Sequence, residues 1–251
     1  MSKRNTLIIV GLALLLAILI FMGNRDNTMD TFSPAKTNIS DQPQSFDKTR
    51  LSIDDSNSIW VVVNKTRPLN PTNYVPSDLI VPNVPLRYNA SYDEMKLRKE
   101  AADALQDMTS SAKSESINLK LASGYRSFNL QTSVYNNFVK TQGRAVADTQ
   151  SARPGYSEHQ TGLAADLEPV DRTCEIEDCF ANTKEGIWLA ANSYKFGYIV
   201  RYQPGKQSLV GYKYEPWHFR YVGRELAAEL KKQNNPTLEE FFGLPPAPDY
   251  N

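Results

Sequence analysis

The chain has 251 residues, and its 28 Lys and Arg residues are balanced by 28 Asp and Glu residues. The chain has no excess of basic residues to neutralise phosphates, so nucleic acid is not expected as a partner. The length and an apolar content of 41% are sufficient for one globular domain with a buried core, plus a tail.

The first segment is predicted to be a membrane anchor. Lys3 and Arg4 precede an apolar run over residues 7–22, which would be about 24 Å long as a helix. Residues 21–24 contain no small-x-small cleavage site, so an N-terminal transmembrane helix over residues 1–23 is favoured over a cleaved signal segment. The preceding positive charges place the remainder of the chain on the extracytoplasmic side of the cell membrane, or in the medium if the segment is cleaved.

Residues 24–57 are rich in polar residues and proline, which predicts a flexible stalk. A domain over residues 58–251 follows. Its first apolar segment, Trp60–Val63, has the composition of a buried strand, and the proline-rich residues 70–88 are expected to be extended.

The remaining segments alternate between helical and strand patterns. Helices are predicted over 91–114, from a Ser127 cap to Gly143, over 184–197 and over 224–233. Strands are predicted over 117–124, 162–169, 198–202 and 218–223. This order favours a single α+β domain with a small, mainly antiparallel sheet flanked by helices, preceded by the transmembrane helix.

The two cysteines, Cys174 and Cys179, are separated by four residues. In an exported domain a local disulfide is the favoured interpretation, although such a small loop adds limited stability. Two inert thiols or a thiolate zinc site are the alternatives.

The chain contains only two histidines, His159 and His218, and each lies at a predicted strand edge near carboxylates. Together with Asp166 they would supply three ligands for a zinc ion and leave a fourth position for water. Glu215 is then the nearest unassigned carboxylate for acid/base work on that water. Pro216 opposes a helix here and so separates the pattern from a helical HExxH box. The competing interpretation is a pair of packed histidines without a metal.

Three motifs in this order, "SGYRS", "SEHQTGLAAD" and "YEPWHFRYVG", resemble those of the VanY-type D-alanyl-D-alanine carboxypeptidases of the M15 peptidase family, which includes L,D-carboxypeptidase relatives. The resemblance covers about residues 62–222. It implies one Zn²⁺ ion held by His159, Asp166 and His218, with Glu215 as the catalytic acid/base. It also implies that Arg126 acts in the substrate site, and that Gln131 and Ser157 contact the substrate.

Physical chemistry agrees with the role of Arg126, because a fixed guanidinium pairs with a terminal carboxylate or stabilises an oxyanion. For Tyr125 and Trp217, packing beneath the site is favoured. Arg153 is a weaker candidate for substrate contact.

The expected function is hydrolysis of the terminal D-alanine of peptidoglycan stem peptides by a zinc D,D-carboxypeptidase outside the cytoplasmic membrane. Its expected partners are the stem peptide and, through the N-terminal helix, the membrane. An L,D-carboxypeptidase that trims the tetrapeptide, an endopeptidase and a non-catalytic wall-binding module are the alternatives.

Overall fold

The computed structural model describes residues 45–250. The predicted anchor over residues 1–23 and the stalk up to residue 44 lie outside this range. Within residues 45–250, no helix has the length and apolar character needed to cross a membrane.

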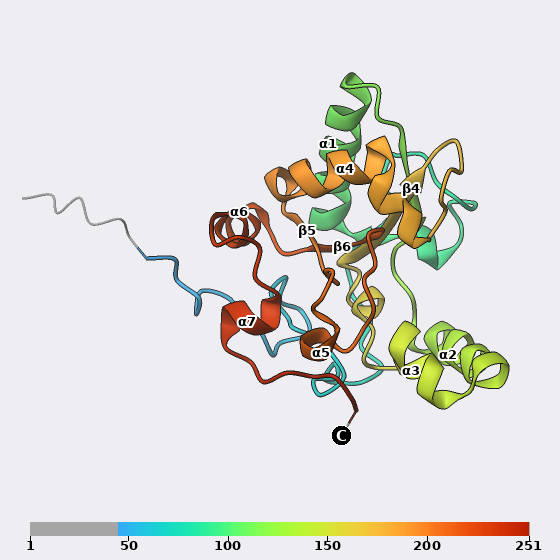
Figure 1. The fold of residues 1–251 in the computed structure, drawn as a ribbon, viewed down its shortest axis with the longest axis vertical. Helices are drawn as coiled ribbons and strands as arrows, with labels where there is room; N and C mark the ends of the chain where they lie inside the picture. The colour runs from blue at the N-terminus through green and yellow to red at the C-terminus, as the bar shows by residue number, and fades with distance from the viewer. Residues whose placement is uncertain (1–44, 251) are drawn as a thin grey trace, which may run out of the picture. The chain divides into compact units, whose positions relative to one another are not determined.

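A four-stranded antiparallel sheet carries the site (Figure 1). Its order is β3-β4-β6-β5, with strands Leu119–Ser123, Ala164–Pro169, His218–Tyr221 and Tyr198–Val200. A two-stranded antiparallel pair, β1 (Leu79–Ile80) and β2 (Leu97–Arg98), forms a separate small sheet. This sheet and its helices confirm the predicted α+β fold.

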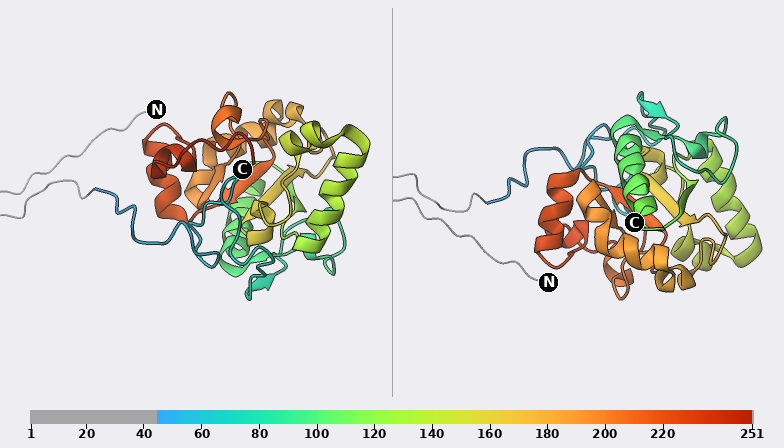
Figure 2. Two further views of the ribbon diagram at one scale, coloured as in Figure 1. Left: turned by 90° about the horizontal axis from the view of Figure 1, so that it is seen from below. Right: turned by 90° about the horizontal axis from the view of Figure 1, so that it is seen from above.

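The helices fall into three groups. The longest, α1 (Lys99–Ser114), and α4 (Lys184–Asn192) share one apolar core with the sheet. The α6 (Arg224–Lys232) and α7 (Leu238–Phe242) helices build a second core around Trp60. The α2 (Phe128–Gln142) and α3 (Arg144–Gln150) helices contact each other and stand to one side, as Figures 1 and 2 show.

Short elements complete the domain. They are α5 (Gln207–Val210) and four 3₁₀ turns, η1 (Asp93–Met95), η2 (Glu158–Thr161), η3 (Asp178–Asn182) and η4 (Ser193–Phe196). As predicted, the Ser127 hydroxyl caps α2 by accepting from the amide of Leu130.

Two predicted elements are wrong. Trp60–Val63 is buried but forms no strand, because side chains rather than a neighbouring strand take its carbonyls: Arg220 donates to Val61 and Arg67 donates to Val62. The helix expected from residue 91 begins at Lys99. Asp93–Met95 forms a 3₁₀ turn instead, and the chain is extended from Lys96, whose carbonyl accepts from the amide of Tyr125.

Residues 45–57 belong to the folded unit, although their composition resembles that of the preceding stalk. The Phe46 ring stacks on Trp60 with centroids 5.5 Å apart, and Ile53 packs against the core around α6 and α7. The fold therefore includes chain before the boundary at residue 58 that composition indicates.

Candidate active site

Three side chains meet where β4 and β6 lie side by side. Asp166 on β4 is paired in register with His218 on β6, and His159 lies on the η2 turn that leads into β4. His159 Nε2 is 3.3 Å from Asp166 Oδ2, and His218 Nδ1 is 3.2 Å from Asp166 Oδ1. One ligand atom from each residue lies within 4.8 Å of the others, which is the grouping that a single metal ion requires.

Each imidazole is oriented by its other nitrogen. His159 Nδ1 donates to the carbonyl of Gly124 at 2.7 Å, and His218 Nε2 lies 3.4 Å from Glu158 Oε2. The His159 contact fixes the tautomer that leaves its Nε2 atom unprotonated for a metal, and the His218 contact orients that ring. Gly124 is required here, since a Cβ atom at this position would lie 2.3 Å from the carbonyl oxygen of Lys96.

A buried network of charges holds Glu158. Its Oε1 atom accepts from Arg201 at 2.8 Å and from Arg220 at 2.9 Å, and Arg201 also forms two hydrogen bonds with Glu239. Burial opposes ionisation of Glu158, but the two guanidinium groups hold its pKa well below the usual range. Glu158 therefore stays anionic beneath His218. The sequence motif gave no signal for this network, because its partners are distant in the chain.

The three residues fit a zinc ion. The Oδ1 atom of Asp166 is buried and makes no hydrogen bond within residues 45–250, which is costly unless a cation takes its lone pair. Burial lowers the pKa of His159 and keeps that imidazole neutral, as metal ligation requires. Two imidazoles and one carboxylate form a donor set that zinc accepts in hydrolytic sites.

Glu215 lies beside the metal ligands in the turn before β6. Its Oε2 atom is 3.6 Å from His218 Nδ1, and its side chain is 15% exposed. Burial raises its pKa to about 7. A carboxyl group with that pKa accepts and returns protons at neutral pH.

Arg126 lines the same cavity, which has a volume of about 430 Å³. Its guanidinium donates to Gln131 Oε1 at 3.1 Å and to Ser123 Oγ at 3.0 Å. The buried Gln131 amide donates in turn to Ala152 O and Ser151 Oγ, so Gln131 positions Arg126. Ser157 also lines the cavity, and its hydroxyl does not cap the η2 turn.

The other predicted side chains differ in their placement. Tyr125 is buried, and Trp217 packs against the core while one side lines the cavity. Arg153 is paired with Asp148 at 2.9 Å and does not line the cavity. The lining that the sequence did not indicate includes Tyr202, Tyr212, Tyr214, Ile176 and Asp178.

Comparison with known proteins agrees with this geometry. A family model described as "VanY: D-alanyl-D-alanine carboxypeptidase" matches residues 94–224. The putative carboxypeptidase YodJ of Bacillus subtilis is 42% identical over 191 residues, which cover 76% of this chain and 69% of that protein. A D-alanyl-D-alanine carboxypeptidase of Enterococcus faecalis is 32% identical over 63% of this chain and 62% of its own length.

Two solved structures extend the comparison. The LdcB LD-carboxypeptidase is 42% identical, with a TM-score of 0.71 over 75% of this chain and 87% of its own. The D,D-pentapeptidase VanY from a VanB-type resistance cassette, solved as a variant with Zn(II), is 31% identical, with a TM-score of 0.60 over 74% of this chain and 99% of its own. The second structure binds zinc in the same fold.

Proposed function

The chain belongs to the VanY family of D-alanyl-D-alanine carboxypeptidases, and from that premise we propose that it hydrolyses the terminal D-alanine of peptidoglycan stem peptides as a zinc enzyme. The observation that carries the proposal is the convergence of His159, Asp166 and His218 beside the carboxyl group of Glu215.

The three ligands would hold one zinc ion, which when bound lowers the pKa of water and polarises the scissile carbonyl. Glu215 takes the proton from the attacking water at its carboxylate. It then gives that proton to the nitrogen of the leaving D-alanine. Since its pKa is raised by burial, both protonation states of Glu215 are available near neutral pH.

Arg126 recognises the substrate's end. Its guanidinium faces the cavity while Gln131 and Ser123 hold it in place, so it is pre-organised to pair with a terminal carboxylate. This pairing distinguishes a carboxypeptidase from an endopeptidase, whose substrate has no free carboxylate at this position. Ser157 supplies a hydroxyl to the same wall.

A second candidate is L,D-carboxypeptidase activity on the tetrapeptide. The observation favouring it is the LdcB structure, which is more similar to this chain in sequence and in TM-score than the VanY structure. Zinc-loaded protein should therefore be incubated separately with the pentapeptide and the tetrapeptide, and the products weighed by mass spectrometry. Loss of alanine from the pentapeptide supports the D,D activity, loss from the tetrapeptide supports the L,D activity, and cleavage of neither contradicts both.

We also propose that residues 7–22 anchor the enzyme in the cell membrane with the catalytic domain outside. The support is the uninterrupted apolar run after Lys3 and Arg4, and a disulfide, which persists in oxidising compartments. Full-length protein should stay with the membrane pellet after an alkaline wash, and protease added to intact spheroplasts should remove the domain. Release into the medium would instead show cleavage of the segment.

A further inference from the structure

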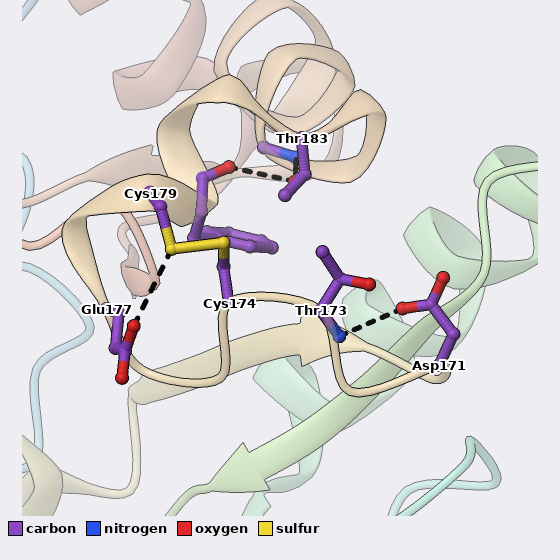
Figure 3. Close-up of a disulfide and its surroundings, with 8 residues drawn as sticks. Asp171, Thr173, Cys174, Glu177, Cys179 and Thr183 are labelled. Atoms are coloured by element: carbon purple, nitrogen blue, oxygen red, sulfur yellow. Dashed lines mark hydrogen bonds between the residues drawn. A yellow bond between two sulfur atoms is a disulfide. The ribbon is translucent and has the colours of Figure 1, made fainter.

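A disulfide-closed loop forms part of the cavity wall. Cys174 and Cys179 are bonded, as the sequence favoured, and close a loop between β4 and α4 (Figure 3). Two residues of this loop region, Ile176 and Asp178, line the cavity that holds Arg126 and Glu215. None of the three sequence motifs that resemble the VanY family includes this loop.

The backbone of this loop adopts an unusual conformation. Cys174 and Ile176 have φ angles of 54° and 52°, in the left-handed region that a β-branched residue such as isoleucine rarely enters. Such conformations persist only where surrounding structure fixes them. Here the disulfide closes the loop, and the neighbouring Phe180 is fully buried in the core. The side chains of Ile176 and Asp178 are therefore presented from a constrained backbone.

The charges along the cavity have opposite signs at different positions. The backbone amide of Arg126 donates to the carbonyl of the metal ligand His159, whereas Asp178 lines the cavity together with Ile176 and Tyr214. Within residues 45–250 the Asp178 carboxylate is exposed and forms no ion pair. Burial, and then the charge of Asp178, raises the pKa of Tyr214, which is consistent with a carboxylate close to that phenol.

We propose that Asp178 is a specificity-determining residue that binds a primary ammonium group on a substrate side chain upstream of the scissile bond. The inference rests on the proposed function, in which Arg126 binds the terminal carboxylate. A stem peptide held there extends from the zinc ligands along the cavity. The residue that carries the side-chain amine is the diamino acid of the stem peptide, upstream of the scissile bond. Asp178 then pairs with the ammonium, and Ile176 packs on the methylene groups that lead to it.

The adjacent Glu177 provides a matched control. It is exposed and carries the same charge, but it is not part of the cavity lining. Figure 3 shows its carboxylate directed at the disulfide, with Oε2 3.7 Å from Cys179 Sγ. Lys213 also lines the cavity, so the effect of its charge on substrate preference must be measured separately from the effect of Asp178.

The test uses zinc-loaded protein and two stem peptides that differ only in whether the side-chain amine of the diamino acid is free or acetylated. Wild-type protein should cleave the free-amine peptide with a kcat/KM about fivefold higher, through KM, and added salt should reduce this preference. D178N should lower the kcat/KM of the free-amine peptide to that of the acetylated one. E177Q and K213Q should keep the preference.

Equal cleavage of the two peptides by wild-type protein, or a preference that survives D178N, would overturn the assignment while leaving the carboxypeptidase function intact. Loss of the preference in E177Q to the same degree would also overturn it, because the effect would then come from overall charge. Cleavage of neither peptide by zinc-loaded protein would overturn the proposed function itself.

Discussion

The Oε2 atom of Glu158 lies 3.4 Å from Nε2 of His218, whose other ring nitrogen, Nδ1, faces Asp166. A carboxylate in this position orients the imidazole and raises its basicity, and removal of such a partner lowers metal affinity about 10- to 100-fold. We expect E158Q to bind zinc that much more weakly than wild-type protein, as measured by competition with a chromophoric chelator.

Glu168 supplies the control for this variant. It is a buried carboxylate on the same strand as Asp166, and Arg87 and Lys120 pair with it at 3.2 and 3.1 Å, away from the metal ligands. E168Q should lose stability but keep its zinc affinity. Equal zinc affinities in E158Q and wild-type protein would show that Glu158 does not act through His218.

Glu215 should be needed for hydrolysis but not for zinc binding. Because it lies outside the set of three ligands, E215Q should retain one zinc per chain, while loss of the proton acceptor should lower kcat by about 10²- to 10⁴-fold or more. Zinc content and stem-peptide hydrolysis measured on one preparation check this. E225Q, an exposed carboxylate on α6, is the control and should keep full activity. Unchanged hydrolysis by E215Q would contradict its assigned role.

Arg126 should act on the substrate's terminal carboxylate. R126M should raise KM for a free-acid peptide by about tenfold or more, and it should affect the corresponding C-terminal amide far less, because the amide has no charge to pair. R126K should recover part of the loss. Q131L, which removes the amide that holds the guanidinium, should show a smaller effect of the same kind. Equal effects on acid and amide would contradict this pairing.

The sequence was most informative where neighbouring residues carry both the structure and the chemistry. The His159 and Asp166 motif includes the turn and strand that position it, and Glu215 and His218 are three residues apart, so each half of the site is a local pattern. The family resemblance implied that the two halves meet. The Ser127 cap was predictable for the same reason. In α7, the capping box formed by Thr237 and Glu240 is likewise a local pattern that marks a helix start.

What the sequence did not predict depends on contacts between distant segments. Trp60–Val63 has strand composition, yet the carbonyl of Val61 accepts from Arg220, which is distant in the chain. Glu158 is adjacent to His159, but its role follows from two arginines on β6 and just after β5. The positions of Ile176 and Asp178 depend on how the disulfide loop packs, which no spacing indicates.

Glu239 should make the stability of the fold sensitive to acid. Burial opposes its ionisation, but Arg201 and Asn64 hold its pKa below the usual 4.5. A carboxylate with a lowered pKa contributes stability that is present above pH 4.5 and is lost as pH falls through its folded-state value. E239Q should therefore cost about 3–5 kcal/mol at pH 7, because it leaves Arg201 partly unpaired, and the difference from wild-type protein should shrink below pH 4.5.

Urea unfolding at pH 7 and at pH 3.5 measures this difference. D103N, which removes an exposed ion pair with Lys99 on α1, is the control and should change the free energy of unfolding by about 0.5 kcal/mol or less. A difference between E239Q and wild-type protein that stays constant with pH would show that folding does not lower the pKa of Glu239.

The Cys174–Cys179 disulfide should stabilise the domain modestly and shape substrate binding more strongly. The bond closes a short loop, with a sequence separation of 5, so its effect on unfolded-chain entropy is about 2 kcal/mol. The loop carries Ile176 and Asp178 on the cavity wall, whereas the metal ligands lie on other elements. Replacing both cysteines with serine should therefore lower the free energy of unfolding by about that amount and leave the zinc content unchanged.

KM for stem peptides should rise several-fold in this variant with kcat retained, because a freed loop no longer presents its side chains from one backbone conformation. Treatment of wild-type protein with a reductant should reproduce the rise in KM, and the serine variant should not respond to it. An unchanged KM in the serine variant would show that packing alone holds the loop, while a loss of zinc would show that the loop supports the metal ligands.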